Sequence, residues 1–192
     1  MAKVSLKNAK YCPVTVTTSE GTESETYGTT ATLSKAIRAA VTINSTDTTL
    51  YADDAIAEYI SEFVDGSITF EGDDIEDAVA ADIMGATLDS ESGEITYKGG
   101  DSAKYIRLGF IVGRIKNNAK QYKAIIYTRV KFNPMGDDFE TKGQTIVFKT
   151  ASLSGKIMRN ATDEWKKDSG WKDMEQAAQT YLSSNIKPTT GG

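Results

Sequence analysis

The chain reads TTLYADDAIAEYISEFVDGSITFEGDDIEDAVAADIMG over residues 48–85, and this stretch decides the expected fold class. In its middle, apolar and polar residues alternate, with Ile68 and Phe70 on one side. A period of two is typical of a half-buried β-strand. Asp65 and Gly66 precede the alternation and tolerate the positive φ of a two-residue turn, so they predict a hairpin.

A short helix is expected directly after this strand. Asp73 is a good N-cap, and Glu76 three residues later gives an acidic variant of the capping box. Apolar residues then recur at helical spacing at Ile75, Val79 and Ile83. Gly85 is suited to end the helix, because glycine readily adopts the left-handed conformation of a helix C-terminus.

Most other patterned segments also predict strands. They are residues 11–18, 37–43, 94–98, 105–116, 123–132, 145–150 and 152–159. Asn117-Asn118 predicts a turn, and Asp168 or Ser169 is expected to begin a C-terminal helix. Short strands separated by turns favour a mainly β fold, which we expect to be a β-sandwich or barrel-like structure with one or two flanking α-helices.

The residue types exclude several classes of enzyme. The chain has no histidine and a single cysteine, Cys12, which rules out a Ser-His-Asp triad, a Cys-His dyad, a zinc site and an intrachain disulfide. It contains no GxxxxGK[ST] or GxGxxG sequence for binding phosphate. The acidic run at 73–77 lacks the ligand spacing of a calcium loop. We therefore expect no catalytic activity, no cofactor and no metal.

Charge is divided unevenly along the chain. Residues 1–100 contain 18 acidic and 6 basic residues, a net charge of −12, whereas residues 101–192 contain 9 and 16, a net charge of +7. Three interpretations are open: chance drift between solvated faces, an acidic patch that meets a basic patch on another copy, or nucleic-acid binding by the basic half. We expect neither a signal peptide nor a stretch approaching the about 18 apolar residues of a membrane-spanning helix.

Several of these segments together resemble the major tail protein, or tail tube protein, of long-tailed, non-contractile bacteriophages of Gram-positive bacteria. The likeness is carried by VSLKNAKY at 4–11, LYADD at 50–54, the strand and acidic helix described above, and the strand pair at 105–132. The resemblance implies a tail-tube fold whose copies form hexameric rings around a shared β-barrel. The rings stack into a tube in the virion tail, assembled in the host cytoplasm, and DNA is only passing cargo. Implied partners are other copies of the chain and the tape measure, tail terminator and distal tail proteins, with no membrane.

The resemblance also assigns roles within a single domain over residues 1–192. It implies an N-terminal arm at about 1–10, an inter-subunit loop at about 44–55, and a C-terminal helix and tail at about 160–192. The loop residues expected to contact a neighbour are Leu50, Tyr51, Asp53 and Asp54. If a hairpin at 57–71 belongs to the shared barrel, the residues expected to face the lumen are Glu58, Glu62, Ser67, Thr69 and Glu71. An acidic wall would not bind the phosphates of passing DNA.

Two alternatives belong to other functional classes. One is a nucleic-acid-binding β-barrel that uses a basic ribbon at 104–131, with Arg107, Arg114, Lys116, Lys120, Lys123, Arg129 and Lys131. The other is a carbohydrate-binding or adhesion sandwich, which needs exposed aromatic platforms that the sequence does not place. Trp165 and Trp171 are expected to anchor the C-terminal segment to the sandwich or to a neighbouring copy, rather than to stack on bases or on an anionic partner. Formation of rings or tubes separates the tail-tube interpretation from both alternatives.

Overall fold

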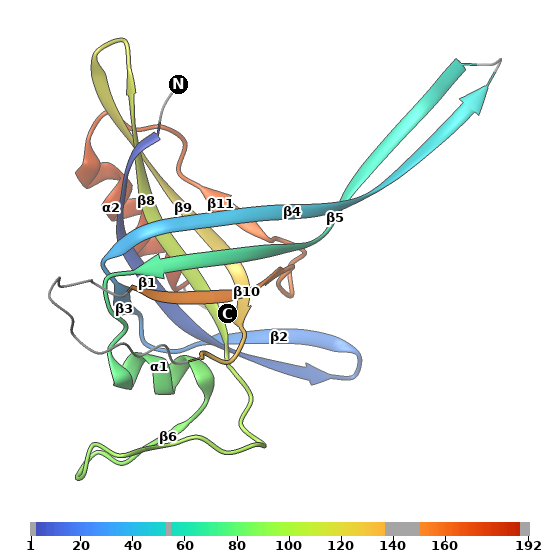
Figure 1. The fold of residues 1–192 in the computed structure, drawn as a ribbon. Coiled ribbons are helices and arrows are strands. Elements are labelled where there is room, and N and C mark those ends of the chain that lie inside the picture. Colours follow the sequence, from blue (N-terminus) through green and yellow to red (C-terminus); the bar gives the residue numbers. More distant parts are fainter. Residues whose placement is uncertain (1–2, 53–54, 137–149, 189–192) are drawn as a thin grey trace, which may run out of the picture.

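The computed structural model describes residues 3–52, 55–136 and 150–188. The strands are β1 (Lys3–Ser19), β2 (Thr22–Tyr27), β3 (Ala31–Ser34), β4 (Ala36–Ala52), β5 (Ala55–Gly72), β6 (Thr87–Leu88), β7 (Ile95–Thr96), β8 (Tyr105–Lys116), β9 (Ala119–Phe132), β10 (Ala151–Met158) and β11 (Lys166–Asp168). The helices are α1 (Asp77–Met84) and α2 (Glu175–Ile186). The expected fold class is confirmed, since the protein is mainly β with two flanking helices (Figure 1).

Nine of the described strands form one antiparallel sheet. Its order is β2-β1-β8-β9-β10-β5-β4, with β3 also paired to β1 and β11 also paired to β9. The sheet is strongly bent, so that β4 and β5 cross over β8 and β9, and β4 comes into contact with β1 (Figure 1). A separate ribbon of β6 and β7 lies beside α1 at one end of the body. The bent sheet thus packs against itself as the two layers of a sandwich do.

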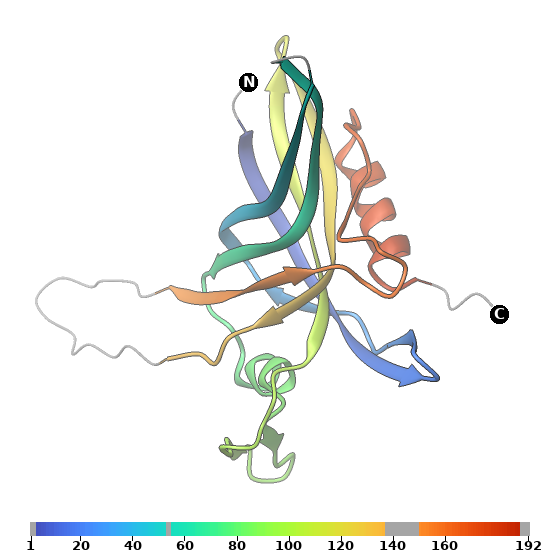
Figure 2. The same cartoon turned by 90° about the vertical axis from the view of Figure 1, so that its right-hand side faces the viewer.

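Strands β8 and β9 are buried on both faces. On one face Phe110 and Tyr127 join the main hydrophobic cluster, which also contains Ile68 and Phe70 of β5. The expected inward direction of Ile68 and Phe70 is therefore confirmed. The other face packs under α2 in a second cluster of Cys12, Ile111, Ala124, Ile126, Ala178, Leu182 and Ile186. Figure 2 shows α2 on one side of this strand pair and β10, β5 and β4 on the other.

The prediction of a turn at Asp65-Gly66 is wrong. Strand β5 runs through both residues without interruption, and Gly66 pairs with Ile43 of β4 on one side and with Ile157 of β10 on the other. A Cβ atom at Gly66 would lie 3.0 Å from Ile43 Cδ1 and 3.3 Å from Ile157 Cβ. Glycine serves close packing of three strands here and not a turn, so the hairpin expected at 57–71 does not form.

The hairpin that does form joins β4 to β5. Its register runs from Ala36 opposite Gly72 to Ala52 opposite Ala55. Most of the inter-subunit loop expected at 44–55 is therefore strand. The sequence does not show this, because a strand exposed to water on both faces has no need of the apolar alternation by which strands are recognised.

Both ends of the chain also differ from expectation. Residues 3–10, expected to form an arm, are the first part of β1 and pair with β8 over much of their length. Helix α2 begins at Glu175, later than the expected start at Asp168 or Ser169. The Ser169 amide instead donates a hydrogen bond of 3.0 Å to the carbonyl of Ala124 in β9. Asp168 and Ser169 therefore form backbone hydrogen bonds or pairs with β9 instead of capping a helix.

Helix α1 forms where it is expected, but it begins later. Its N-cap is Glu76, whose side chain makes no capping hydrogen bond. The Asp73 carboxylate accepts hydrogen bonds from the amides of Lys35, at 3.0 Å, and Asp74, at 2.9 Å. Asp73 therefore ties the end of β5 to the bend between β3 and β4 instead of capping the helix. Gly85 ends the helix as expected, with a φ of 71°.

We predict that Gly155→Ala destabilises the protein. Gly155 lies in β10 between Phe132 and Ile68, and a Cβ there would be 2.5 Å from the Lys131 carbonyl oxygen and 2.9 Å from Phe132 Cα. Backbone atoms cannot move aside cheaply, so we expect a loss of ~1–3 kcal/mol in the free energy of unfolding, measured with urea. Gly100→Ala is the control, since its Cβ meets nothing within 4 Å. Equal stability of the two variants would contradict the close packing of β9 and β10.

We also predict a loss of stability at alkaline pH that depends on Tyr127. Burial raises the pKa of Tyr127 to about 12, from an unfolded value of about 10. The fold therefore favours the neutral phenol, and this stabilisation is complete below pH ~10 and is lost as the pH rises toward ~12. Urea unfolding at pH 8 to 11 should show a shallower decline for Tyr127→Phe than for the wild type. Tyr97→Phe, at an exposed tyrosine, should follow the wild-type curve.

Candidate interaction surface

Strands β4 and β5 leave the body of the protein as a two-stranded arm. As far out as Gly66, β5 lies between β4 and β10, but beyond that residue its only strand partner among the described residues is β4. Residues 45–52 and 55–64 form this arm, which we call the projecting ribbon (Figure 1). An isolated two-stranded ribbon is at best marginally stable in water. Contact with another molecule would therefore stabilise the projecting ribbon.

The base of the projecting ribbon is fixed to the body through Phe63. Its ring stacks on Trp165, with centroids 4.6 Å apart and planes 2° from parallel. Arg159 lies 5.8 Å from the centroid of the same ring and donates a hydrogen bond to the Phe63 carbonyl. The pairing register shifts at Val64, a β-bulge that redirects the strand. These contacts confirm that Trp165 anchors the C-terminal segment to the sheet.

Large apolar side chains are exposed along the projecting ribbon. They are Leu50, Tyr51, Ile56, Tyr59, Ile60 and Val64, with exposed fractions from 47% for Ile60 to 67% for Tyr51. The pairing of β4 with β5 places Tyr51, Ile56 and Tyr59 on one face. Leu50 and Ile60 lie on the other face. Several large exposed apolar side chains on one segment are typical of an interaction site.

The charges on the described part of the projecting ribbon are all negative. They belong to Asp47, Glu58 and Glu62. Hydrogen bonds from Ser61 and Tyr59 lower the pKa of Asp47, so this carboxylate is ionised at neutral pH. The sequence has no lysine or arginine between Arg38 and Lys98. The ribbon therefore presents a surface that is both apolar and acidic.

The expected contact residues only partly define this surface. Leu50 and Tyr51 lie exposed near the tip, whereas Asp53 and Asp54 lie outside the described residues. The sequence prediction missed Ile56, Tyr59, Ile60 and Val64, because their segment was assigned to a hairpin in the body. One signal was present: in AIAEYISEFV, apolar residues occupy both sides of a strand, which a strand buried on one face alone would not show.

The lumen-facing candidates fall into two groups. Three lie within the sheet on the face of β5 opposite the core, namely Ser67, Thr69 and Glu71. Two lie further out on the projecting ribbon, namely Glu58 and Glu62. Arg38 on the neighbouring strand forms an ion pair of 2.9 Å with Glu71. The structure therefore places these candidates along one strand, but it does not gather them into one compact acidic patch.

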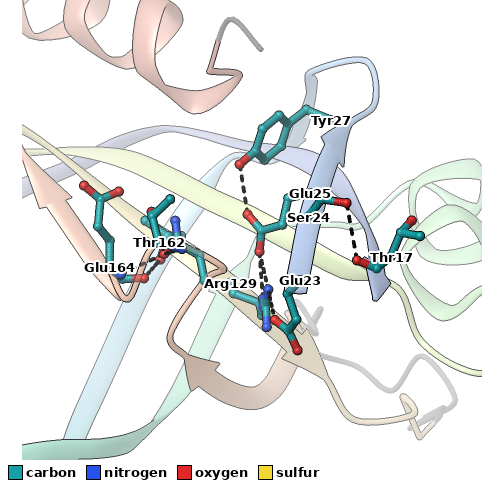
Figure 3. A network of polar contacts seen from close by, with 10 residues as sticks. Thr17, Glu23, Ser24, Glu25, Tyr27, Arg129, Thr162 and Glu164 are labelled. Atoms are coloured by element: carbon teal, nitrogen blue, oxygen red, sulfur yellow. Dashed lines mark hydrogen bonds and ion pairs between the residues drawn. The ribbon is translucent and has the colours of Figure 1, made fainter. Parts of the chain in front are cut away.

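Several cations of the basic ribbon at 104–131 are buried or paired with acidic side chains of the same chain. Arg129 donates hydrogen bonds to Glu25 at 2.5 and 2.8 Å and to Glu23 at 3.0 Å (Figure 3). Tyr27 donates a further hydrogen bond of 2.9 Å to Glu25, as Figure 3 also shows. This network joins β2 to β9 across the sheet order. It holds the β1–β2 hairpin against the body.

Other members of the basic ribbon are covered by the C-terminal segment. Arg107 is buried and donates a hydrogen bond of 3.2 Å to a backbone carbonyl in the last turn of α2. The guanidinium of Arg114 lies 3.9 Å from the ring centroid of Trp171. Lys123 forms an ion pair of 3.1 Å with Asp168. These contacts remove several cations from any continuous basic surface on β8 and β9.

No group of three or more histidine, cysteine, aspartate or glutamate side chains within the described ranges is arranged to hold a metal ion. Neither described helix is long and apolar enough to cross a membrane.

Comparisons of the sequence with protein-family models and with curated proteins find no match. The projecting ribbon is the candidate functional site of this protein.

We predict that Glu25 and Glu23 differ sharply in their effect on stability. Both contact Arg129, but the Glu25 side chain is 3% exposed and the Glu23 side chain 45%. Glu25→Ala leaves a buried arginine short of its main partner, so we expect a loss of roughly 3 kcal/mol in unfolding free energy. Glu23→Ala breaks a surface contact and should cost no more than ~1 kcal/mol. Urea unfolding of the two variants checks this order, and the reverse order would contradict the network.

Proposed function

We propose that this protein is a structural subunit of a bacteriophage tail tube, which assembles through its projecting ribbon into stacked, hexameric rings that conduct DNA. The observation that carries the proposal is a long two-stranded ribbon with large apolar side chains exposed on both faces. Fully burying one such side chain stabilises a contact by ~1.5–3 kcal/mol. In a repeating assembly, the next copy always offers a surface against which to bury them.

The strand edges of the sheet support the same proposal. β2 and β4 stand at the two ends of the strand order, and β4 is 17 residues long. A long edge strand offers unpaired backbone groups to another chain, and monomeric proteins usually shorten or cover such edges. A β-barrel shared between copies would pair these edges and remove the hazard. Assembly into a tube would therefore explain why β4 is a long edge strand.

The charge pattern suits a conduit for DNA. In a tube built from this sheet, Glu58, Glu62, Ser67, Thr69 and Glu71 remain the candidates for the lumen wall. Cations beside them are matched within the chain, since Arg38 pairs with Glu71 and Lys156 pairs with Asp65 at 2.6 Å. A wall without free cations binds phosphates weakly, because it releases few counterions from the duplex.

The proposed role sets the partners and location of the protein. Its main partner would be other copies of the chain, joined in the virion tail by the tape measure, tail terminator and distal tail proteins. A tube subunit works by contact and shape, so it requires no catalytic residue, cofactor or metal. Concentrated wild-type protein should form rings or tubes in negative-stain electron microscopy. Protein that stays monomeric at every concentration would contradict the proposal.

We predict that removing the projecting ribbon blocks assembly but not folding. Ser45 lies directly opposite Phe63, so residues 46–62 can be replaced by an Asn-Gly turn without disturbing the pairing in the body. Tyr51→Ala is the point variant, and it should change the unfolding free energy by less than ~0.5 kcal/mol because Tyr51 is exposed. Both variants should remain monomeric in light scattering under conditions in which the wild type forms rings or tubes.

The matched control for the point variant is Tyr97→Ala. Tyr97 is also a largely exposed tyrosine, and it lies beside the β6–β7 ribbon at a different end of the body. This variant should assemble as the wild type does. Normal tubes from Tyr51→Ala, or an equal loss of assembly in the two variants, would count against a specific role for the ribbon.

A further inference from the structure

A second apolar surface lies open on the body, beside the first part of β4. It is a groove of about 780 Å³ between β1, β4, β8 and β9, which we call the body groove. Its apolar lining includes Val4, Leu6, Ile37, Ile43, Phe110 and Trp165. Val4 is 54% exposed and Ile37 is 53% exposed, so the groove leaves large apolar side chains in contact with water. Like the projecting ribbon, it is a surface that no other described segment of the chain covers.

The charges of the body groove are opposite to those of the projecting ribbon. Its charged lining residues are Lys166 and Arg38, of which Arg38 also pairs with Glu71, and no acidic side chain among the described residues lines it. The ribbon carries Asp47, Glu58 and Glu62 and no described cation. The two surfaces are therefore complementary in apolar character and in charge. Complementarity of this kind favours the correct partner and the correct orientation.

From this match we infer that the tip of the projecting ribbon of one copy docks in the body groove of a second copy. The inference rests on the proposed self-assembly and names the surface that receives the ribbon. Tyr51, Ile56 and Tyr59 would enter the apolar groove, and Asp47, which lies on the same face of the ribbon, would face Lys166. β4 carries the ribbon tip at one end and lines the groove at the other, so the contact is head-to-tail. A head-to-tail contact repeats from copy to copy and closes into a ring if the rotation allows.

Another groove, between α1, β7, β9 and β10, fits the ribbon less well. Two of its three lysines are engaged within the chain, since Lys131 donates a hydrogen bond of 2.9 Å to Ser102 and Lys156 pairs with Asp65 at 2.6 Å. Asp101 also lines it and would repel an acidic ribbon. The body groove is therefore the better receptor.

A lipid surface is the other environment that an exposed apolar tip could enter. The carboxylates of Asp47, Glu58 and Glu62 oppose this, because anionic headgroups repel them and desolvation of a charge is costly. We expect the protein not to float with vesicles of phosphatidylcholine and phosphatidylglycerol. Flotation that Tyr51→Ala abolishes would overturn docking on a second copy in favour of membrane binding.

Cysteine cross-linking between full-length copies tests the docking directly. One population carries Ala57→Cys, an exposed position on the ribbon that spares its large apolar side chains. A second population carries Ser5→Cys in the body groove, and a matched third carries Ser102→Cys in the other groove. The native Cys12 is buried, so a short bismaleimide reports only the introduced pairs.

We expect cross-linked heterodimers when Ala57→Cys is mixed with Ser5→Cys and only background when it is mixed with Ser102→Cys. Ile37→Glu should abolish assembly, whereas Leu88→Glu, at an exposed site away from both surfaces, should not. If rings form but give no cross-linked product with Ser5→Cys, or give it with Ser102→Cys instead, docking in the body groove is wrong. Self-assembly would still be supported by the rings themselves. A wild-type protein that never associates would overturn both.

Discussion

The pairing of β4 with β5 is the constraint on which the rest of this structure depends. Near Gly66 the pair belongs to the sheet, with β10 on one side and the main hydrophobic cluster beneath it. Beyond Phe63 the pairing continues, through a further register shift between Leu50 and Tyr51, to Ala52 opposite Ala55, and no third strand among the described residues stabilises it. Hydrogen bonds between two strands offset little of the entropy lost in ordering them. Burial of the ribbon against another molecule would supply the stabilisation that pairing of two strands alone does not.

The body gives this ribbon a firm base. Helix α2 covers one face of β8 and β9, β11 pairs along the edge of β9, and β10, β5 and β4 lie on the other side (Figure 2). Trp165 stacks on Phe63 where the ribbon begins, so the C-terminal segment supports the arm as well as the core. Arg129 and Glu25 close β2 onto the same body. In the proposed assembly, an arm held in a fixed direction would let every copy form the same contact.

Local features of the fold could be predicted from the sequence, and features that depend on distant partners could not. The strand at 105–116 and the turn at Asn117-Asn118, where φ is 50° and 60°, follow from alternation and turn chemistry within a few residues. The unequal charge of the two halves of the chain is also plain in the sequence. Which charges remain on the surface is not, because the Arg129–Glu25 pair joins residues 104 positions apart.

The sequence by itself determined the mainly β class and the burial of Ile68 and Phe70, because each follows from a pattern within its own segment. Only the tertiary structure decided that Gly66 packs between strands instead of turning. It alone decided that β5 extends beyond β10, which turns an expected polar loop into a projecting ribbon. The physical reason is that a β-strand does not carry its own partners. The segments that lie beside it determine which of its residues are buried and which are left to bind another chain.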